Sequence, residues 1–255
     1  MPLLETRKVG KSFKGLTALH DIDLSVDEGT ITGLIGPNGA GKTTLFNLIS
    51  GEFPPTKGTV IFDDQDITRL SPDRICRMGI SRTYQLVRPF LGLTLLQNVL
   101  IGIYFGRKER VEEGEAHKEA RGLIDLMGLS EKTDYKAIHL IPVERKRLEI
   151  ARALATKPRL ILLDEVVAGL NPTETGKIME LIGKIRDSGV TILMIEHVMK
   201  VVMGLSHKLI VLHHGVKIAE GAPERISQDP AVIKAYLGER RKGKANLEKG
   251  GGLDA

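Results

Sequence analysis

The sequence has little cysteine, no long hydrophobic run and no strong charge of one sign, and each absence excludes something. Cys76 is the one cysteine among 255 residues, which excludes an internal disulfide and fits a reducing cytosol. The longest apolar stretch, residues 91–106, is interrupted by Gln97 and Asn98 and is too short to span a bilayer comfortably. The first residues lack the layout of a signal peptide. We therefore expect a soluble globular protein.

The net charge is only +5, with a pI near 9.2, and much of the excess lies close to the end of the sequence. Residues 240–244 read Arg-Arg-Lys-Gly-Lys and are followed by a glycine-rich stretch. This composition predicts a flexible, solvated tail over residues 240–255, in preference to a nucleic-acid site. We expect residues 1–239 to form one large domain and expect no nucleic-acid partner.

A glycine-rich motif is the main functional signal. It fits G-x-x-x-x-G-K-[ST], the pattern of a loop that wraps the phosphates of a nucleotide. Its glycines let backbone N–H groups approach an anion, Lys42 can reach the β- and γ-phosphates, and the Thr43 hydroxyl can hold Mg²⁺. The predicted nucleotide-binding residues are Gly36, Pro37, Asn38, Gly39, Ala40, Gly41, Lys42, Thr43 and Thr44.

The residues around this motif have the order that a phosphate loop requires. Residues 30–35 are β-branched and apolar, as in a buried strand, and residues 44–50 are predicted to be a helix that stops at Gly51. Strand, loop and helix therefore follow one another. Phe13, upstream, is either an ordinary core residue or an aromatic ring placed to stack on a base.

Further buried strands alternate with helices along the chain, at residues 160–164 and 190–195. This alternation predicts a largely parallel α/β sheet, with antiparallel strands near the N-terminus joined through residues 11–15. Residues 86–157 differ in composition and are predicted to be mainly helical, with one helix over residues 144–156.

Polar residues follow three predicted strands at the ends where α/β proteins bind ligands. Asp164 can hold Mg²⁺ and Glu165 can orient or deprotonate a water molecule. Gln85 can contact the metal or that water, and His197 can donate to a γ-phosphate. Each has an alternative, since carboxylates often mark an exposed strand end and a histidine is often structural. Their joint occurrence around a phosphate loop favours nucleoside triphosphate hydrolysis.

These motifs together resemble the ATP-binding subunits of ABC transporters over nearly the whole chain. Residues 36–43 are similar to Walker A, residues 160–164 to Walker B, and Glu165 to the catalytic glutamate. Gln85 is similar to the Q-loop residue, His197 to the H-loop residue and Phe13 to the aromatic A-loop residue. Residues 82–85, 148–154, 168–172 and 235–239 are closer still to the ATPases of branched-chain amino acid importers.

The resemblance implies a P-loop NTPase (RecA-like) lobe with an antiparallel β subdomain and an inserted helical subdomain at about residues 86–157. It implies ATP and Mg²⁺ as cofactors, and two ATP-binding subunits that sandwich two ATPs. It also implies integral membrane permease subunits as partners, docked beside Gln85 and residues 86–91 at the cytoplasmic face of the membrane.

The family's signature loop, LSGGQ, is altered here to Leu140, Ile141, Pro142, Val143 and Glu144. Ile141 has no hydroxyl and Pro142 has no N–H. We expect Val143 to resist the positive φ open to glycine and to crowd a phosphate. The signature face should therefore serve a second subunit's ATP poorly, which favours a heterodimer over a homodimer. Val166 and Val198 replace a family proline and aspartate.

Two other functions stay open at this point. One is a nucleotide-dependent clamp that scarcely hydrolyses ATP, which the altered signature favours and which Glu165 and His197 oppose. The other is an ABC ATPase of a different kind, such as another importer, an exporter, or a soluble protein that acts on DNA or ribosomes. The paired ATPase domains or long coiled coils of such soluble proteins are not evident in this sequence.

Overall fold

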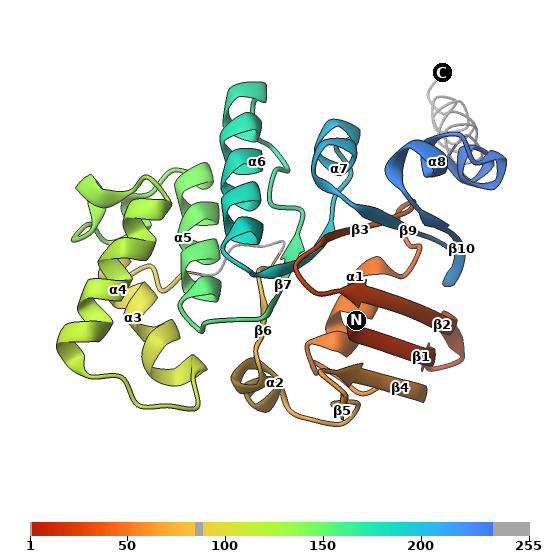
Figure 1. The fold of residues 1–255 in the computed structure, drawn as a ribbon, viewed down its shortest axis with the longest axis horizontal. Helices are drawn as coiled ribbons and strands as arrows, with labels where there is room; N and C mark the ends of the chain where they lie inside the picture. The colour runs from red at the N-terminus through yellow and green to blue at the C-terminus, as the bar shows by residue number, and fades with distance from the viewer. Residues whose placement is uncertain (1, 85–88, 237–255) are drawn as a thin grey trace, which may run out of the picture.

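The computed structural model describes residues 2–84 and 89–236, and Figure 1 shows two sheets with helices around them. The larger sheet has the order β10-β9-β3-β8-β7-β6. Its strands pair in parallel, except that β10 is antiparallel to β9. The bounds are β3 (Ile31–Ile35), β6 (Ile80–Arg82), β7 (Leu160–Asp164), β8 (Thr191–Ile195), β9 (Lys208–His213) and β10 (Val216–Gly221).

The smaller sheet is antiparallel and is built mainly from the N-terminal residues, in the order β2-β1-β4-β5. Its strands are β1 (Pro2–Phe13), β2 (Leu16–Asp27), β4 (Lys57–Phe62) and β5 (Gln65–Asp66). Alternate residues of β2 are buried, as its sequence pattern predicts. One expectation is wrong: residues 11–13 belong to β1, because Phe13 pairs with Leu16 and leaves only two residues for the turn.

Helices cover the larger sheet and fill the space between the two sheets. Helix α1 (Lys42–Ile49) lies between the sheets, and Phe46 belongs to the core that both share. Helices α6 (Pro172–Asp187), α7 (Met199–Leu205) and α8 (Pro223–Ser227) lie on the opposite face of the larger sheet. Helix α2 (Pro72–Met78) precedes β6, as predicted, and residues 230–236 are helical.

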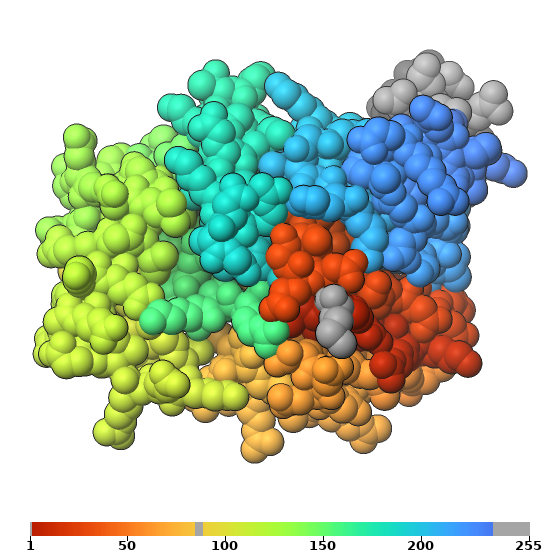
Figure 2. Space-filling model, viewed as in Figure 1, coloured from red at the N-terminus to blue at the C-terminus, as the bar shows by residue number. Residues whose placement is uncertain are grey.

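A group of helices forms one side of the molecule, seen at the left of Figures 1 and 2. It comprises α3 (Leu95–Gly106), α4 (Glu113–Leu126) and α5 (Pro142–Leu154), with short 3-10 turns at Ser130–Lys132 and Ala137–His139. Its core is continuous with that beneath α6, through residues such as Leu148 and Leu163. Helix α5 begins two residues earlier than predicted, because proline suits a first helical position. Within the described residues no helix has the length and apolarity that crossing a membrane requires.

Candidate functional site

The loop between β3 and α1 has a backbone that only glycine can form. Gly36, Gly39 and Gly41 have φ angles of 150°, 77° and 102°. A Cβ on Gly36 would lie 2.1 Å from the carbonyl oxygen of Leu212, and one on Gly41 would lie 2.6 Å from a methyl of Leu19. The motif's glycines are therefore needed both for the turn and for close packing. The loop ends at the N-terminus of α1, where backbone N–H groups favour an anion.

Lys42 and Thr43 occupy the first turn of α1, as the motif predicts. The Lys42 ammonium donates to the carbonyl oxygens of Gly36 and Pro37, at 2.7 and 2.8 Å, so the side chain folds back over the loop. Asn38, Gly39 and Thr43 are exposed, Thr44 is half-buried and Ala40 is buried.

Asp164 is the last residue of β7 and is almost completely buried. Its Oδ2 lies 3.1 Å from Nη2 of Arg82, and its backbone N–H donates to the Thr83 hydroxyl. Burial raises the pKa of the Asp164 carboxyl, and Arg82 counteracts that rise. Its other oxygen, Oδ1, is buried with no hydrogen-bond partner among the described residues. An unpartnered buried carboxylate oxygen is costly unless a cation or water contacts it.

Glu165 and His197 follow neighbouring strands, and their side chains meet. Nε2 of His197 lies 2.8 Å from Oε1 of Glu165. Glu165 has a left-handed backbone with φ of 51°, and its N–H donates to the carbonyl oxygen of Ile195. A positive φ costs a glutamate backbone energy, and such strain clusters at functional sites. Here it turns the carboxylate toward His197.

Two residues that sequence reasoning missed hold the loop after Glu165 in place. Oε1 of Glu196 accepts from the Val167 N–H at 3.0 Å, and the ammonium of Lys146 donates to the carbonyl oxygen of Ala168 at 2.6 Å. Burial raises the pKa of Glu196 and lowers the pKa of Lys146. The sequence could have indicated Glu196, because it is a polar residue directly after a buried strand. It could not have indicated Lys146, because that residue is one of many charged residues in its helix.

The altered signature residues form the start of α5. Leu140 is buried, Ile141 is the exposed N-cap and Pro142 is the first helical residue. Val143 has a helical backbone, so it does not adopt the positive φ that valine was expected to resist. Its side chain is 7% exposed and packs within the chain, and crowding of a partner's phosphate stays a prediction.

The carboxylate of Glu144 caps this helix from within the chain. Its Oε2 accepts from the Ile141 N–H at 3.2 Å, and its Oε1 lies 2.5 Å from the ammonium of Lys132. The side chain is only 13% exposed. A negative charge therefore already occupies the helix end that attracts anions.

Two predicted residues, Gln85 and Phe13, remain. Gln85 lies outside the residues that the structure describes. Phe13 is 42% exposed at the end of β1, its ring 5.3 Å from that of Phe53 and 5.0 Å from the ammonium of Lys11. One part of the ring is therefore free of protein and the other is packed.

These residues fit MgATP. A Cβ on Gly39 would meet no other atom within 4 Å, so the loop is open at this position. The unpartnered Asp164 Oδ1 and the hydroxyl of exposed Thr43 are the hard oxygen ligands that Mg²⁺ takes. Within the described part of the chain no three His, Cys, Asp or Glu residues cluster as metal ligands.

Comparison with known proteins agrees with this geometry. Residues 19–168 match the family model described as ABC transporter, and residues 216–242 match one described as branched-chain amino acid ATP-binding cassette transporter. The chain belongs to the ABC transporter family. As an ABC ATPase, it combines the P-loop NTPase lobe and antiparallel sheet predicted from its sequence.

Relatives of this ABC ATPase match it nearly end to end. The high-affinity branched-chain amino acid transport ATP-binding protein LivG of Escherichia coli (strain K12) is 41% identical, over 93% of this chain and 98% of that protein. A probable branched-chain amino acid transport ATP-binding protein of Archaeoglobus fulgidus is 36% identical, over 93% and 96%.

Solved structures show the same arrangement. An ATP-binding cassette of an ABC transporter in its ADP conformation has a TM-score of 0.85 and 35% identity, over 93% of this chain and 99% of that one. A dimeric bacterial ABC transporter cassette has a TM-score of 0.79 and 27% identity, over 86% and 98%.

Proposed function

We propose that this ABC ATPase binds MgATP at the loop of residues 36–43 and hydrolyses it to energise the import of branched-chain amino acids. One observation carries the catalytic part. Lys42, Asp164, Glu165 and His197 lie at or beyond the carboxyl ends of three adjacent parallel strands, where α/β sheets bind ligands. The substrate class comes from the relatives, which are named as branched-chain amino acid transport proteins.

The chain's own residues divide the work. Lys42, now bonded to two loop carbonyls, would move to the β- and γ-phosphates. Thr43 and Asp164 Oδ1 would hold Mg²⁺, which would neutralise charge on the phosphate oxygens when bound. Glu165 takes a proton from the attacking water, and His197 keeps the glutamate oriented and donates to the γ-phosphate. Gln85 contacts the metal or the water, and Phe13 stacks on the adenine.

The signature face suggests which second ATP-binding subunit is suitable. Each ATP in the sandwich needs the start of the opposite subunit's α5, and here the Glu144 carboxylate occupies that position. Ile141 offers no hydroxyl to the phosphate. A heterodimer would therefore have one competent and one impaired site, whereas a homodimer would have two impaired sites. The same feature favours, as a second candidate, a clamp that closes on ATP with little hydrolysis.

Membrane partners complete the transporter. We place the subunit at the cytoplasmic face of the membrane, bound to integral permease subunits, with residues 86–157 as the helical subdomain and no nucleic-acid partner. We propose residues 1–239 as the ATPase domain and residues 240–255, which lie outside the described part of the chain, as a separate basic segment.

The test is uptake by the whole transporter. The subunit is purified with its membrane partners, reconstituted in vesicles with ATP inside, and given labelled leucine outside with its binding protein. We expect ATP-dependent uptake that Glu165→Gln abolishes. ATP hydrolysis without uptake of any branched-chain amino acid would refute the substrate class. ATP binding without hydrolysis in the assembled complex would favour the clamp.

A further inference from the structure

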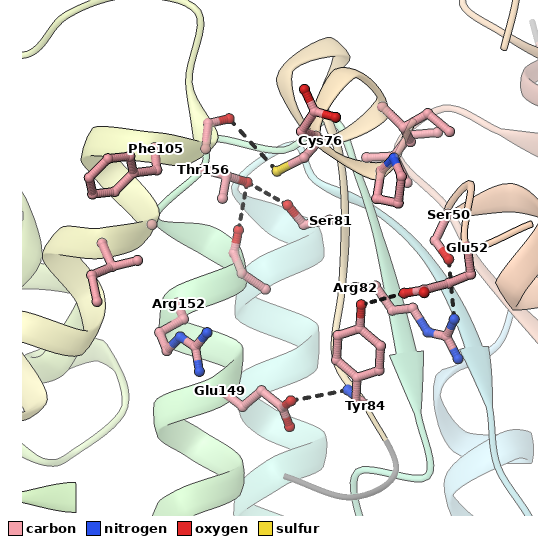
Figure 3. Close-up of a pocket in the computed structure, with 18 of the residues that line it drawn as sticks. Ser50, Glu52, Cys76, Ser81, Arg82, Tyr84, Phe105, Glu149, Arg152 and Thr156 are labelled. Atoms are coloured by element: carbon pink, nitrogen blue, oxygen red, sulfur yellow. Dashed lines mark hydrogen bonds between the residues drawn. The ribbon is translucent and has the colours of Figure 1, made fainter. Parts of the chain in front are cut away.

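A groove of about 780 Å³ runs between the helical side of the molecule and the lobe that carries the phosphate loop. Figure 3 shows it bordered by β6, by α5 and by the segment after α1. Its lining is mixed, with exposed Phe105 beside charged Glu52, Glu149 and Arg152. The groove begins next to Tyr84, the last residue described before residues 85–88, and we take it as the site where a membrane partner docks.

Arg82 lies in the wall of this groove and also reaches the nucleotide site. Its Nη2 lies 3.1 Å from Oδ2 of Asp164, with the two side chains 6% and 2% exposed. Its Nη1 donates to Asn47 Oδ1 at 2.6 Å and to Ser50 Oγ at 3.1 Å, both on or next to α1. One planar cation therefore fixes the metal-binding carboxylate to the helix that follows the phosphate loop.

Tyr84 holds the same guanidinium from the groove side. The carbon at the centre of that guanidinium is 5.0 Å from the Tyr84 ring centroid, close enough for a cation–π contact. The ring is in turn fixed by its hydroxyl, which donates to Glu52 at 2.8 Å, and by its backbone N–H, which donates to Glu149. Tyr84 is 39% exposed, so a segment seated in the groove would touch it.

We propose that Arg82 is a positioning residue that aims Asp164 Oδ1 at Mg²⁺, and that Tyr84 links this positioning to the groove. This inference rests on the proposed MgATP binding. With Oδ2 bonded to Arg82, only Oδ1 is left to face a cation, which is the oxygen without a partner in the described structure. Movement of the Tyr84 ring by a docked partner would shift the guanidinium and with it the carboxylate.

The expected size of the effect follows from other metal sites. Loss of a residue that orients a metal-binding ligand lowers metal affinity or activity by about 10- to 100-fold. Lysine at position 82 keeps the charge but offers one point donor in place of a fork, and cannot bond Asp164, Asn47 and Ser50 together. Removing the Tyr84 ring leaves every bond of the guanidinium intact, so it should have a smaller effect.

The test measures binding by calorimetry, in a Glu165→Gln background that prevents hydrolysis. ATP affinity is measured once with EDTA and once with MgCl₂. The affinity in MgCl₂ divided by the affinity in EDTA is the gain in ATP affinity due to Mg²⁺. We expect Arg82→Gln to reduce that gain about tenfold and Arg82→Lys to reduce it about threefold, with the EDTA affinity unchanged. An unchanged gain in both variants overturns the positioning role. If Arg82→Gln does not fold, Arg82→Lys alone decides.

Matched variants separate positioning from general damage. Arg107 is also 6% exposed and pairs with Glu119 at 2.6 Å, but on the helical side, so Arg107→Gln should destabilise the fold without changing the gain due to Mg²⁺. Tyr84→Leu should reduce the gain about twofold through the lost ring contact, and Tyr84→Phe should not. No effect of Tyr84→Leu overturns the link to the groove. Absence of ATP binding with Arg82 intact would instead refute the proposed function.

Discussion

Replacing Glu144 by glutamine and Ile141 by serine should raise the ATPase rate of the purified chain alone. Glutamine can still accept from the Ile141 N–H, so the helix keeps its cap, but the negative charge disappears. Two unit charges about 6 Å apart interact by roughly 3 kcal/mol at an effective dielectric of about 20. Lys132, 2.5 Å from the carboxylate, already cancels part of this repulsion. We take about 1.4 kcal/mol as the net gain for a phosphate, which is about tenfold in rate.

Serine at position 141 supplies the missing hydroxyl at the exposed N-cap. One such donor contributes about 10²–10³ in rate, so the double variant should exceed wild type by about 10³–10⁴ if the two free energies add. Substitution of Val143 by glycine is a poorer repair, because its side chain is buried and its loss would leave a cavity.

The assay is steady-state phosphate release by the chain without membrane partners. Glu174→Gln is the matched control, since Glu174 Oε2 accepts from the Asn171 N–H at 3.0 Å in the same capping arrangement on α6. The control should leave the rate unchanged. If Glu144→Gln with Ile141→Ser is no faster than wild type, the Glu144 carboxylate does not impair the signature face and the heterodimer argument fails.

Three further predictions follow from the site. Lys42→Ala should weaken ATP binding at least tenfold in calorimetry, since a charged hydrogen bond contributes about 1.5–3 kcal/mol. An unchanged affinity would refute the role of Lys42. Glu165→Gln should lower kcat about 10²- to 10⁴-fold with ATP affinity kept, and equal losses in both would contradict a base. Because burial raises the pKa of Glu196, its stabilising contribution is present below the ordinary value of 4.5 and is lost as pH rises through the higher folded value. Glu196→Gln should therefore gain in melting temperature over wild type as pH rises from 4 to 7, and a constant difference would refute the raised pKa.

The sequence predicted the helices and strands correctly where the order of neighbouring residues determines them. The sequence around Lys42 predicted a strand, a glycine loop and a helix in that order, and the structure has them. The parallel pairing of β7 with β8 brings Asp164 and His197 to the same edge of the sheet. The limits of the N-terminal strands do not follow from local order. Residues 11–13 have no alternation that marks them as strand, and their conformation is set by pairing with β2.

The supporting contacts were beyond prediction because they join residues far apart in sequence. Arg82 meets Asp164 across 82 positions, and Glu196 meets Val167 across 29. Nothing local to Lys146 indicates that its ammonium reaches the carbonyl oxygens of residues 165 and 168. Nothing in the sequence indicated that Val143 lies in the first turn of a helix, where a positive φ is not required.

The left-handed backbone of Glu165 implies a trade between folding and chemistry. At φ of 51° a glycine would be relaxed where the glutamate is not, so Glu165→Gly should make the protein harder to unfold while it stops turnover. Selection for thermal stability alone would therefore favour loss of the Glu165 carboxylate. A directed-evolution campaign that screens only for heat resistance should enrich this inactive substitution.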